Sequence, residues 1–228
     1  MHLLYIPMNR KETKWGLALL AAALLGAFFL PDTVAKLWLY HGPLFFCSVI
    51  IFRRFLAESC QIPLTGPGTI LKFAVLGYVL AFLANLLTND LIYYFLPKCF
   101  GWGETGPYFV NIRKEVIAVC AAENFPMTTI VLVILVPVWE ELIHRGLVFG
   151  TLVQKNVPLA YLVSTLLYIL IPVIPLFGGY RADYVILHIL QYIPISLMFN
   201  WIYTKTETIL TPILAHILMN GLCILSMR

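Results

Sequence analysis

Runs of about 20 apolar residues fill most of this chain, and no other feature restricts its fold as strongly. A helix needs roughly 17–25 such residues to cross the hydrocarbon core of a bilayer. Inside that core every backbone polar group has to be paired within the protein, which a helix achieves within one segment. The runs therefore predict an all-α, polytopic transmembrane helical bundle of about seven spans. We place these spans at Trp15–Leu30, Ala35–Phe52, Ile70–Leu96, Met127–Val153, Pro158–Phe177, Tyr184–Tyr203 and Ile209–Met227.

The composition agrees with a membrane protein. Of the 228 residues, 61% are hydrophobic and only 11% are charged, whereas soluble domains are about 45–50% apolar and about 25% charged. The net charge of +4 is modest and the basic residues are scattered over loops, so no nucleic-acid partner is indicated. We expect residues 1–228 to form a single membrane domain embedded in the lipid bilayer of the cell membrane.

The connecting segments indicate the topology. Ser59–Gly68, which contains two Pro and two Gly, predicts a loop. The mixed polar and apolar stretch Tyr108–Ala122 predicts either an interfacial amphipathic helix or a solvated loop. Short connectors after Met127 require neighbouring helices to be antiparallel. The positive-inside rule favours a cytoplasmic N-terminus, because the basic residues on that side of the first spans outnumber Lys98, Arg113 and Lys114 in the long third loop. They are Arg10, Lys11, Lys14, Arg53, Arg54 and Lys72.

One apolar span carries an unusual polar cluster, in the stretch Pro137–Gly146 (PVWEELIHRG). A Glu at membrane depth costs at least a few kcal/mol unless it has a partner, so such a residue suggests a functional site. Glu141 and Arg145 are four residues apart and can form a buried ion pair on one helix face. Glu140 has the same spacing to His144. Because Arg145 can compensate the charge of Glu141, Glu140 is free to point into a cavity. Burial there disfavours its charged carboxylate, which makes Glu140 suitable as a general base. A purely structural polar contact between helices needs only one Glu–Arg pair, so the second Glu favours a catalytic role over a structural one.

Two other spans offer polar groups that could join this cluster. His216 and Asn220 share one face of the last helix, where His216 could polarise a water or carbonyl and Asn220 could donate to a developing oxyanion. His188 either joins the same cavity or lies at the membrane interface, bonded to Gln191. The chain has neither an HExxH nor a GxSxG motif, which argues against a zincin and against a serine protease.

These motifs resemble those of the CPBP family, which comprises CAAX prenyl endopeptidases and bacterial bacteriocin-processing or self-immunity (Abi) proteins. The resemblance rests on Glu140-Glu141-xxx-Arg145-Gly146 and His216-xxx-Asn220, and it extends over roughly residues 127–227. It implies a CPBP-like catalytic core in residues 127–228, preceded by N-terminal helices and a loop in residues 1–126. It further implies an intramembrane endopeptidase that cleaves a peptide or a lipid-anchored protein near a membrane face.

The same resemblance implies a role for each motif residue. Glu140 would activate the attacking water, and Glu141 with Arg145 would organise the helix. His216 and Asn220 would orient the water or stabilise the tetrahedral oxyanion. No cofactor is firmly implied, although Glu140, His216 and His188 would present a carboxylate and two imidazoles to a zinc ion.

The chain departs from the family pattern at the second motif, an aromatic residue followed four positions later by His. At the expected spacing the chain has Tyr168 and Pro172, so a proline replaces the histidine. Tyr184 and His188 have the right local pattern one segment later. Either His188 substitutes from a neighbouring helix, or the site is impaired.

Two rival functions therefore accompany that of a protease. The first is a catalytically impaired protein of the same fold, acting in bacteriocin self-immunity or as a membrane binding partner. The second is a transporter or channel that uses Glu140 and His216 as a proton relay, against which the lack of an internal repeat argues. The sequence predicts no particular oligomeric state.

Overall fold

The regular elements in the part of the chain that the structure describes are all helices. The computed structural model describes residues 6–29, 34–61, 66–91, 124–177 and 182–225, with residues 95, 98–99 and 122 in addition. In the first half it contains α1 (Arg10–Phe29), α2 (Val34–Ile51), α3 (Arg53–Gln61) and α4 (Pro67–Asp90). In the second half it contains a long helix over Asn124–Val153, followed by α9 (Val157–Val173) with the short 3-10 turn η4 (Ile174–Leu176), α10 (Ala182–Thr206) and α11 (Leu210–Leu225).

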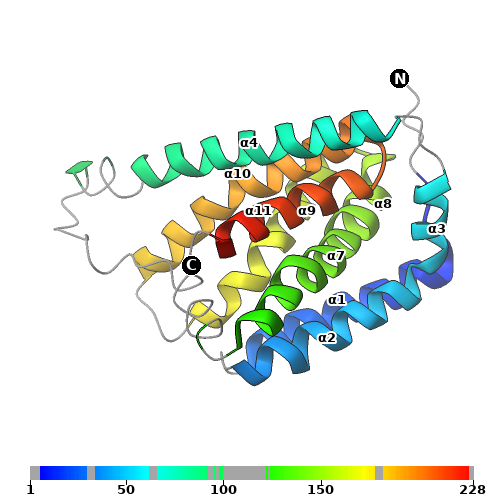
Figure 1. The fold of residues 1–228 in the computed structure, drawn as a ribbon, viewed down its shortest axis with the longest axis horizontal. Coiled ribbons are helices and arrows are strands. Elements are labelled where there is room, and N and C mark those ends of the chain that lie inside the picture. The colour runs from blue at the N-terminus through cyan, green and yellow to red at the C-terminus, as the bar shows by residue number, and fades with distance from the viewer. Residues whose placement is uncertain are drawn as a thin grey trace.

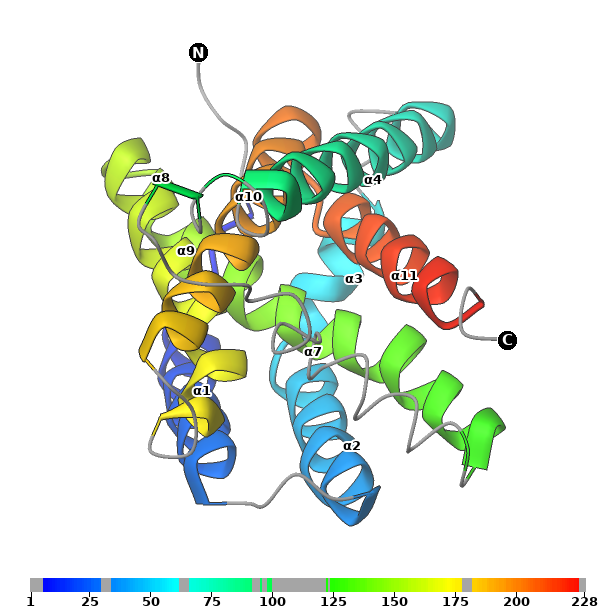
Figure 2. The ribbon, with the colours of Figure 1, turned by 90° about the vertical axis from the view of Figure 1, so that its left-hand side faces the viewer.

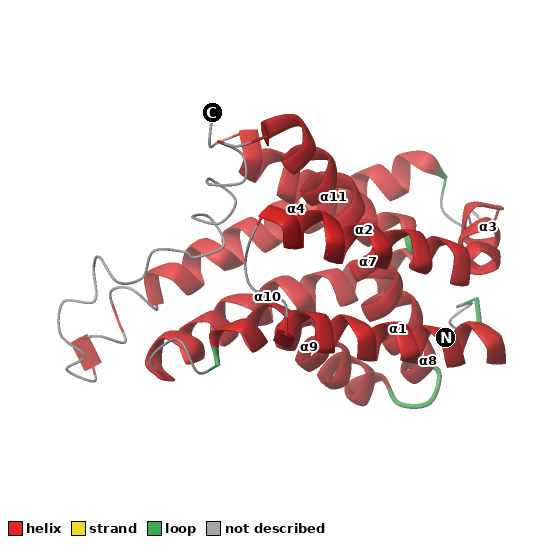
Figure 3. Cartoon of the chain, turned by 90° about the horizontal axis from the view of Figure 1, so that it is seen from below, coloured by secondary structure: helices red, strands yellow, loops and turns green. Residues whose placement is uncertain are grey.

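The predicted all-α membrane bundle is confirmed. Four of the described helices are long and apolar enough to cross a membrane by length and composition: Arg10–Phe29, Pro67–Thr88, Asn124–Val153 and Val157–Leu176. Two shorter apolar helices, Leu37–Ile51 and Leu210–Leu225, accompany them. With α10, these helices correspond to the seven predicted spans, and no strand occurs in the described ranges (Figure 3). The stretch Tyr108–Ala122, where an interfacial helix or a loop is expected, lies outside the described residues.

The helix Asn124–Val153, here called the central helix, lies inside the bundle. It consists of the π-helical segment η2 (Val131–Leu135), α7 (Val136–Glu141), the π-helical segment η3 (Leu142–Phe149) and α8 (Gly150–Val153). It packs against α2 and α11, and further along against α1, α9 and α10 (Figures 1 and 2). Half of its most apolar window is buried, against 17% for Pro67–Thr88, which lies at the edge of the bundle against α10 and α11. The most enclosed helix is thus the one with the Glu-Glu motif.

One predicted connection is wrong in part, because α3 extends to Gln61 and includes the first residues of the expected loop Ser59–Gly68. Ser59 is buried, and Arg54 Nη1 donates to both carboxylate oxygens of Glu58 one turn later, which supports the helix. A second guanidinium nitrogen of Arg54 contacts Glu12 at 2.6 Å, so α3 is held against the start of α1.

The start of α1 is defined by a capping box. The backbone N–H of Asn9 donates to Glu12 Oε2 at 2.8 Å, and the backbone N–H of Glu12 donates to Asn9 Oδ1 at 2.9 Å. These two bonds let the helix begin at Arg10, five residues before the predicted apolar span. Next to this cap, Met8 and Phe55 lie so close to Gly146 of the central helix that an added Cβ would be 3.0 and 3.2 Å from them.

Candidate active site

The two adjacent glutamates of α7 have different surroundings. The side chain of Glu141 is fully buried, and its Oε1 accepts hydrogen bonds from Arg145 Nη1 at 3.2 Å and from His216 Nδ1 at 2.9 Å. The predicted Glu141–Arg145 pair is therefore confirmed. The carboxylate of Glu141 also contacts α11 through His216, and so it fixes the position of the last helix against the central one.

Arg145 lies in a cage of polar and aromatic groups. Its Nη2 donates to the carbonyl oxygen of Ser196 at 3.1 Å and to Ser196 Oγ at 3.0 Å, both on α10. The guanidinium carbon lies 4.4 Å from the ring centroid of Tyr168 and 5.1 Å from that of Phe199. A buried ion pair is tolerated when further hydrogen bonds and such cation–π contacts offset its desolvation. Arg145 thereby connects the central helix to α9 and α10.

His216 is held in one orientation with one ring nitrogen still available. Its Nδ1 is bonded to Glu141 and its ring is stacked on Phe199, with centroids 5.1 Å apart and an interplanar angle of 27°. Its Nε2 is buried, makes no hydrogen bond to any residue that the structure describes and lies 3.9 Å from Glu140 Oε2. The second nitrogen of a histidine fixed in this way can bind a ligand or a water.

Glu140 emerges from the central helix between α2 and α11. Successive helical residues point about 100° apart, and the neighbours of Glu140 contact different helices. Trp139 lies against Tyr40 of α2, with ring centroids 6.1 Å apart, whereas Glu141 contacts His216 of α11. The side chain of Glu140 is 12% exposed, whereas those of Glu141 and His216 are 0% exposed. Glu140 is thus the carboxylate that a substrate could reach.

The spacing of His144 and Glu140 allows a hydrogen bond between their side chains, but His144 contacts the backbone of Glu140 instead. Its Nδ1 lies 2.7 Å from the carbonyl oxygen of Glu140, and its ring packs edge-on against Tyr168 at 5.3 Å. Ser164 of α9 donates to the carbonyl oxygen of His144 at 3.1 Å. This buried histidine therefore supports the turn that carries Glu140.

Asn220 serves the backbone of the central helix. Its Nδ2 donates to the carbonyl oxygen of Leu132 at 2.7 Å. The N–H of Val136 bonds to Val131, in π-helical register, so the carbonyl of Leu132 would next accept from residue 137. That residue is a proline and has no N–H. Asn220 compensates for this break, and its predicted role as an oxyanion donor stays a prediction.

The comparison with known proteins agrees with this geometry. Residues 122–222 match the family model "Type II CAAX prenyl endopeptidase Rce1-like". The chain is also similar to "Putative membrane peptidase YdiL" of Bacillus subtilis (strain 168), with 30% identity over 154 residues. The chain belongs to the CPBP family. The match covers 67% of this chain and 54% of that relative, so the chain spans about half the length of the relative. No solved structure matches the chain.

This chain lacks the second-motif histidine of the CPBP pattern, and no metal-binding cluster among the described residues takes its place. His188 is buried on α10, and Gln191, one turn later, donates to Asn85 of α4 at 3.4 Å. Within the described ranges no three His, Cys, Asp or Glu side chains are grouped closely enough to hold a metal ion. Glu140, His216 and His188 therefore do not form the zinc site that their residue types allow.

Sequence reasoning missed most of the residues around Arg145 in this CPBP protein. The sequence pattern identifies Tyr168 only as the aromatic residue of the second motif, yet its ring contacts both Arg145 and His144. No motif predicts Ser196 or Phe199. A signal was available, since Ser196 and Asn200 are four residues apart in an apolar helix, and Asn200 indeed bonds Ser164 and Thr165 of α9.

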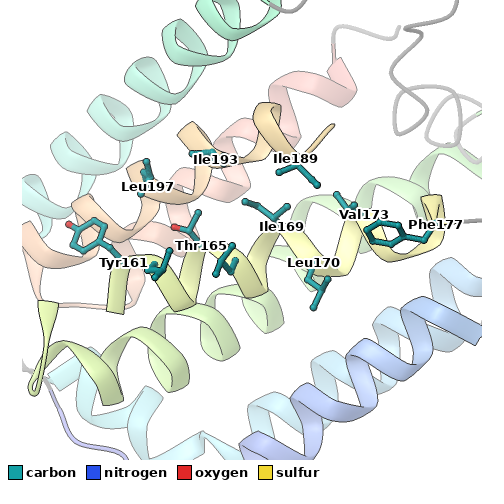
Figure 4. A pocket seen from close by; sticks show the side chains of 11 residues that line it. Tyr161, Thr165, Ile169, Leu170, Val173, Phe177, Ile189, Ile193 and Leu197 are labelled. Atoms are coloured by element: carbon teal, nitrogen blue, oxygen red, sulfur yellow. The ribbon is translucent and has the colours of Figure 1, made fainter. Parts of the chain in front are cut away.

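An apolar groove lies elsewhere on the CPBP core, between α9 and α10 (Figure 4). It has a volume of about 370 Å³, and its eleven lining residues include no acidic residue and no histidine. Leu162 and Leu166 at its wall are each 57% exposed, as expected for side chains that face lipid. The groove is therefore separate from the reaction centre at Glu140.

Proposed function

We propose that the protein is an intramembrane endopeptidase in which Glu140 activates a water molecule for attack on a peptide bond near a membrane face. The observation that carries this proposal is the pair formed by Glu140 Oε2 and His216 Nε2, 3.9 Å apart. One water about 2.8 Å from each atom would bridge them with ordinary hydrogen-bond lengths. Family membership supports a membrane peptidase in general, and this pair supports Glu140 as the residue that activates the water.

The tautomer of His216 follows from its contact with Glu141. When Nδ1–H donates to the carboxylate of Glu141, the neutral ring keeps a lone pair on Nε2. A water can then donate one hydrogen to His216 and the other to Glu140, which turns its own lone pair towards a substrate carbonyl. Glu141 and Arg145 act as positioning residues in this arrangement, because they hold the imidazole and contact no substrate.

The proposed reaction is an ordinary hydrolysis. The water oxygen forms a bond to the carbonyl carbon while its proton passes to Glu140. The carbon–nitrogen bond then breaks, and Glu140 returns the proton to the leaving amine. The substrate is a peptide segment of a membrane or lipid-anchored protein that enters between α2 and α11.

The charge distribution supports the expected orientation. The described end of the bundle with α3 and α8 carries three acidic residues, Glu12, Glu58 and Glu207, and eight basic ones: Arg10, Lys11, Lys14, Arg53, Arg54, Lys72, Lys155 and Lys205. By the positive-inside rule this end, with the N-terminus, faces the cytoplasm.

In a variant with Cys60 of α3 as its sole cysteine, an impermeant maleimide should label inside-out vesicles. Labelling of intact cells instead would contradict this orientation.

A non-catalytic role is the second candidate, and Pro172 on α9 is the observation that favours it, since this position offers no imidazole. Such a protein would act in bacteriocin self-immunity or bind a membrane partner. The two functions differ in their dependence on Glu140. Immunity that survives both Glu140→Gln and His216→Ala would support binding over catalysis.

The proposal is tested without knowing the substrate. Membranes from cells that express the wild-type protein or Glu140→Gln are incubated, and newly formed peptide termini are labelled and identified by mass spectrometry. We expect a set of termini that appears only with the wild-type protein. Identical sets from both membranes, at equal protein levels, would overturn the protease assignment.

A further inference from the structure

We propose that His41 of α2 is the second imidazole of the reaction centre, opposite His216, where it contacts the carbonyl group of the scissile bond. This inference rests on the proposed peptidase function and adds a residue to the same site. His41 lies outside residues 122–222, the stretch that the family model matches. It stands on an element for which the sequence predicted only a membrane span.

The first support is the contact between α2 and the turn that carries Glu140. The His41 ring lies 5.8 Å from that of Trp139 at an interplanar angle of 33°, and 4.8 Å from that of Tyr40. Tyr40 packs on Trp139 as well. Trp139 directly precedes Glu140, so both rings of α2 lie beside the helical turn that carries the reacting carboxylate. In Figure 2, α2 and α11 are on different sides of the central helix.

The second support is the polar character of this side. Tyr40 is buried on α2. Its hydroxyl donates to the carbonyl oxygen of Ala23 at 2.7 Å, which fixes α2 against α1. Next to His41, Trp139 Nε1 is fully buried and has no hydrogen-bond partner in the described part of the chain. Buried N–H groups are nearly always paired, so this indole N–H indicates a place for a polar ligand or water.

The third support is the direction of substrate approach. Glu140 emerges between α2 and α11, and His216 on the α11 side is oriented to hold the water. A scissile bond that approaches between the two helices then has α2 on its other side. There His41 can supply what Pro172 on α9 cannot, a ring N–H that donates to the carbonyl oxygen as it becomes negative. This donation adds no redox step, and the proton balance through Glu140 is unchanged.

Two variants of His41 separate this role from packing. His41→Phe keeps an aromatic ring against Trp139 and Tyr40 but has no nitrogen, whereas His41→Gln keeps a donor and loses the ring. Gly42→Ala is the matched control, since an added Cβ at the neighbouring position meets nothing within 4 Å. His188→Gln tests the other buried histidine, and Glu140→Gln tests the proposed function itself.

The full-length variants are reconstituted in lipid nanodiscs with a fluorogenic peptide. This peptide is built on a bond that is cleaved in membranes with the wild-type protein and not in membranes without the protein. We expect His41→Phe to lower kcat about 100-fold with KM changed less than threefold, in the range of lost oxyanion donors. His41→Gln should recover at least tenfold of that loss, and Gly42→Ala should match the wild type. Unfolding temperatures in detergent should agree within a few degrees.

The possible outcomes distinguish the two proposals. A His41→Phe variant with wild-type kcat, or one that is more active than His41→Gln, shows that the ring only packs, and this overturns the inference. A loss in His188→Gln that exceeds the loss in His41→Phe assigns the second imidazole to α10 and overturns it as well. Cleavage that persists in Glu140→Gln contradicts the proposed function itself.

Discussion

Glu141 and His216 are joined by a 2.9 Å hydrogen bond between Oε1 and Nδ1, across 75 positions of sequence. The same carboxylate oxygen accepts the bond from Arg145 Nη1 at 3.2 Å. One buried oxygen thus neutralises a cation and orients the imidazole that faces Glu140. The first glutamate of the motif is left for chemistry because the second holds its surroundings in place.

Removal of Arg145 should be far more harmful than removal of the whole ion pair. Arg145→Met leaves the Glu141 carboxylate buried without its cation, which should cost about 3–5 kcal/mol in the free energy of unfolding. The double variant Glu141→Gln/Arg145→Met should recover much of this loss, because a neutral amide can still bond His216. Unfolding in mixed detergent and denaturant measures both. An Arg145→Met protein as stable as the double variant would contradict the pairing.

The bond from Asn220 to Leu132 should matter only because residue 137 is a proline. Asn220→Ala leaves a buried carbonyl without its donor and should cost about 1–3 kcal/mol. In a Pro137→Ala background the alanine N–H can pair with Leu132, so the same substitution should cost at least about 1 kcal/mol less. A double-mutant cycle on the unfolding free energy tests this coupling. Equal costs in both backgrounds would show that Asn220 stabilises the protein in another way.

The two carboxylates that bind Arg54 should differ in their effect on stability. Glu12 is 4% exposed and accepts from the backbone of Asn9 as well as from Arg54, whereas Glu58 is 38% exposed. Glu12→Ala should therefore cost about 1–3 kcal/mol through its unpaired buried donors. Glu58→Ala, the matched control on the same guanidinium, should cost about 0–1 kcal/mol. Thermal unfolding of both variants decides this, and equal losses would contradict it.

The fold could be predicted from the sequence because the bilayer leaves so few choices. Apolar runs such as Pro158–Phe177 correspond closely to helices in the structure. Helix boundaries are predicted less accurately, since the capping box at Asn9 and the ion pair of Arg54 extend helices into polar sequence that hydropathy assigns to loops. Local hydrogen bonds decide such boundaries, and average hydropathy does not contain them.

The candidate site could be predicted where both partners lie on one helix. The spacing of Glu141 and Arg145 was sufficient to predict their contact, and it is present. Contacts between helices were not predictable in the same way, because they depend on how each helix is rotated in the bundle. Asn220 turns to the backbone of Leu132, and Tyr168 lies under Arg145, for reasons that only packing shows.

The central claim is that Glu140, and not its neighbour, activates the water. The most direct test is the rate at which wild-type-dependent peptide termini appear in membranes with Glu140→Gln, with Glu58→Gln on exposed α3 as the control. We predict that Glu140→Gln lowers this rate at least about 100-fold, as expected for loss of a general base, while its unfolding temperature and that of Glu58→Gln stay near the wild-type value. Cleavage by a folded Glu140→Gln protein at the wild-type rate would contradict the account.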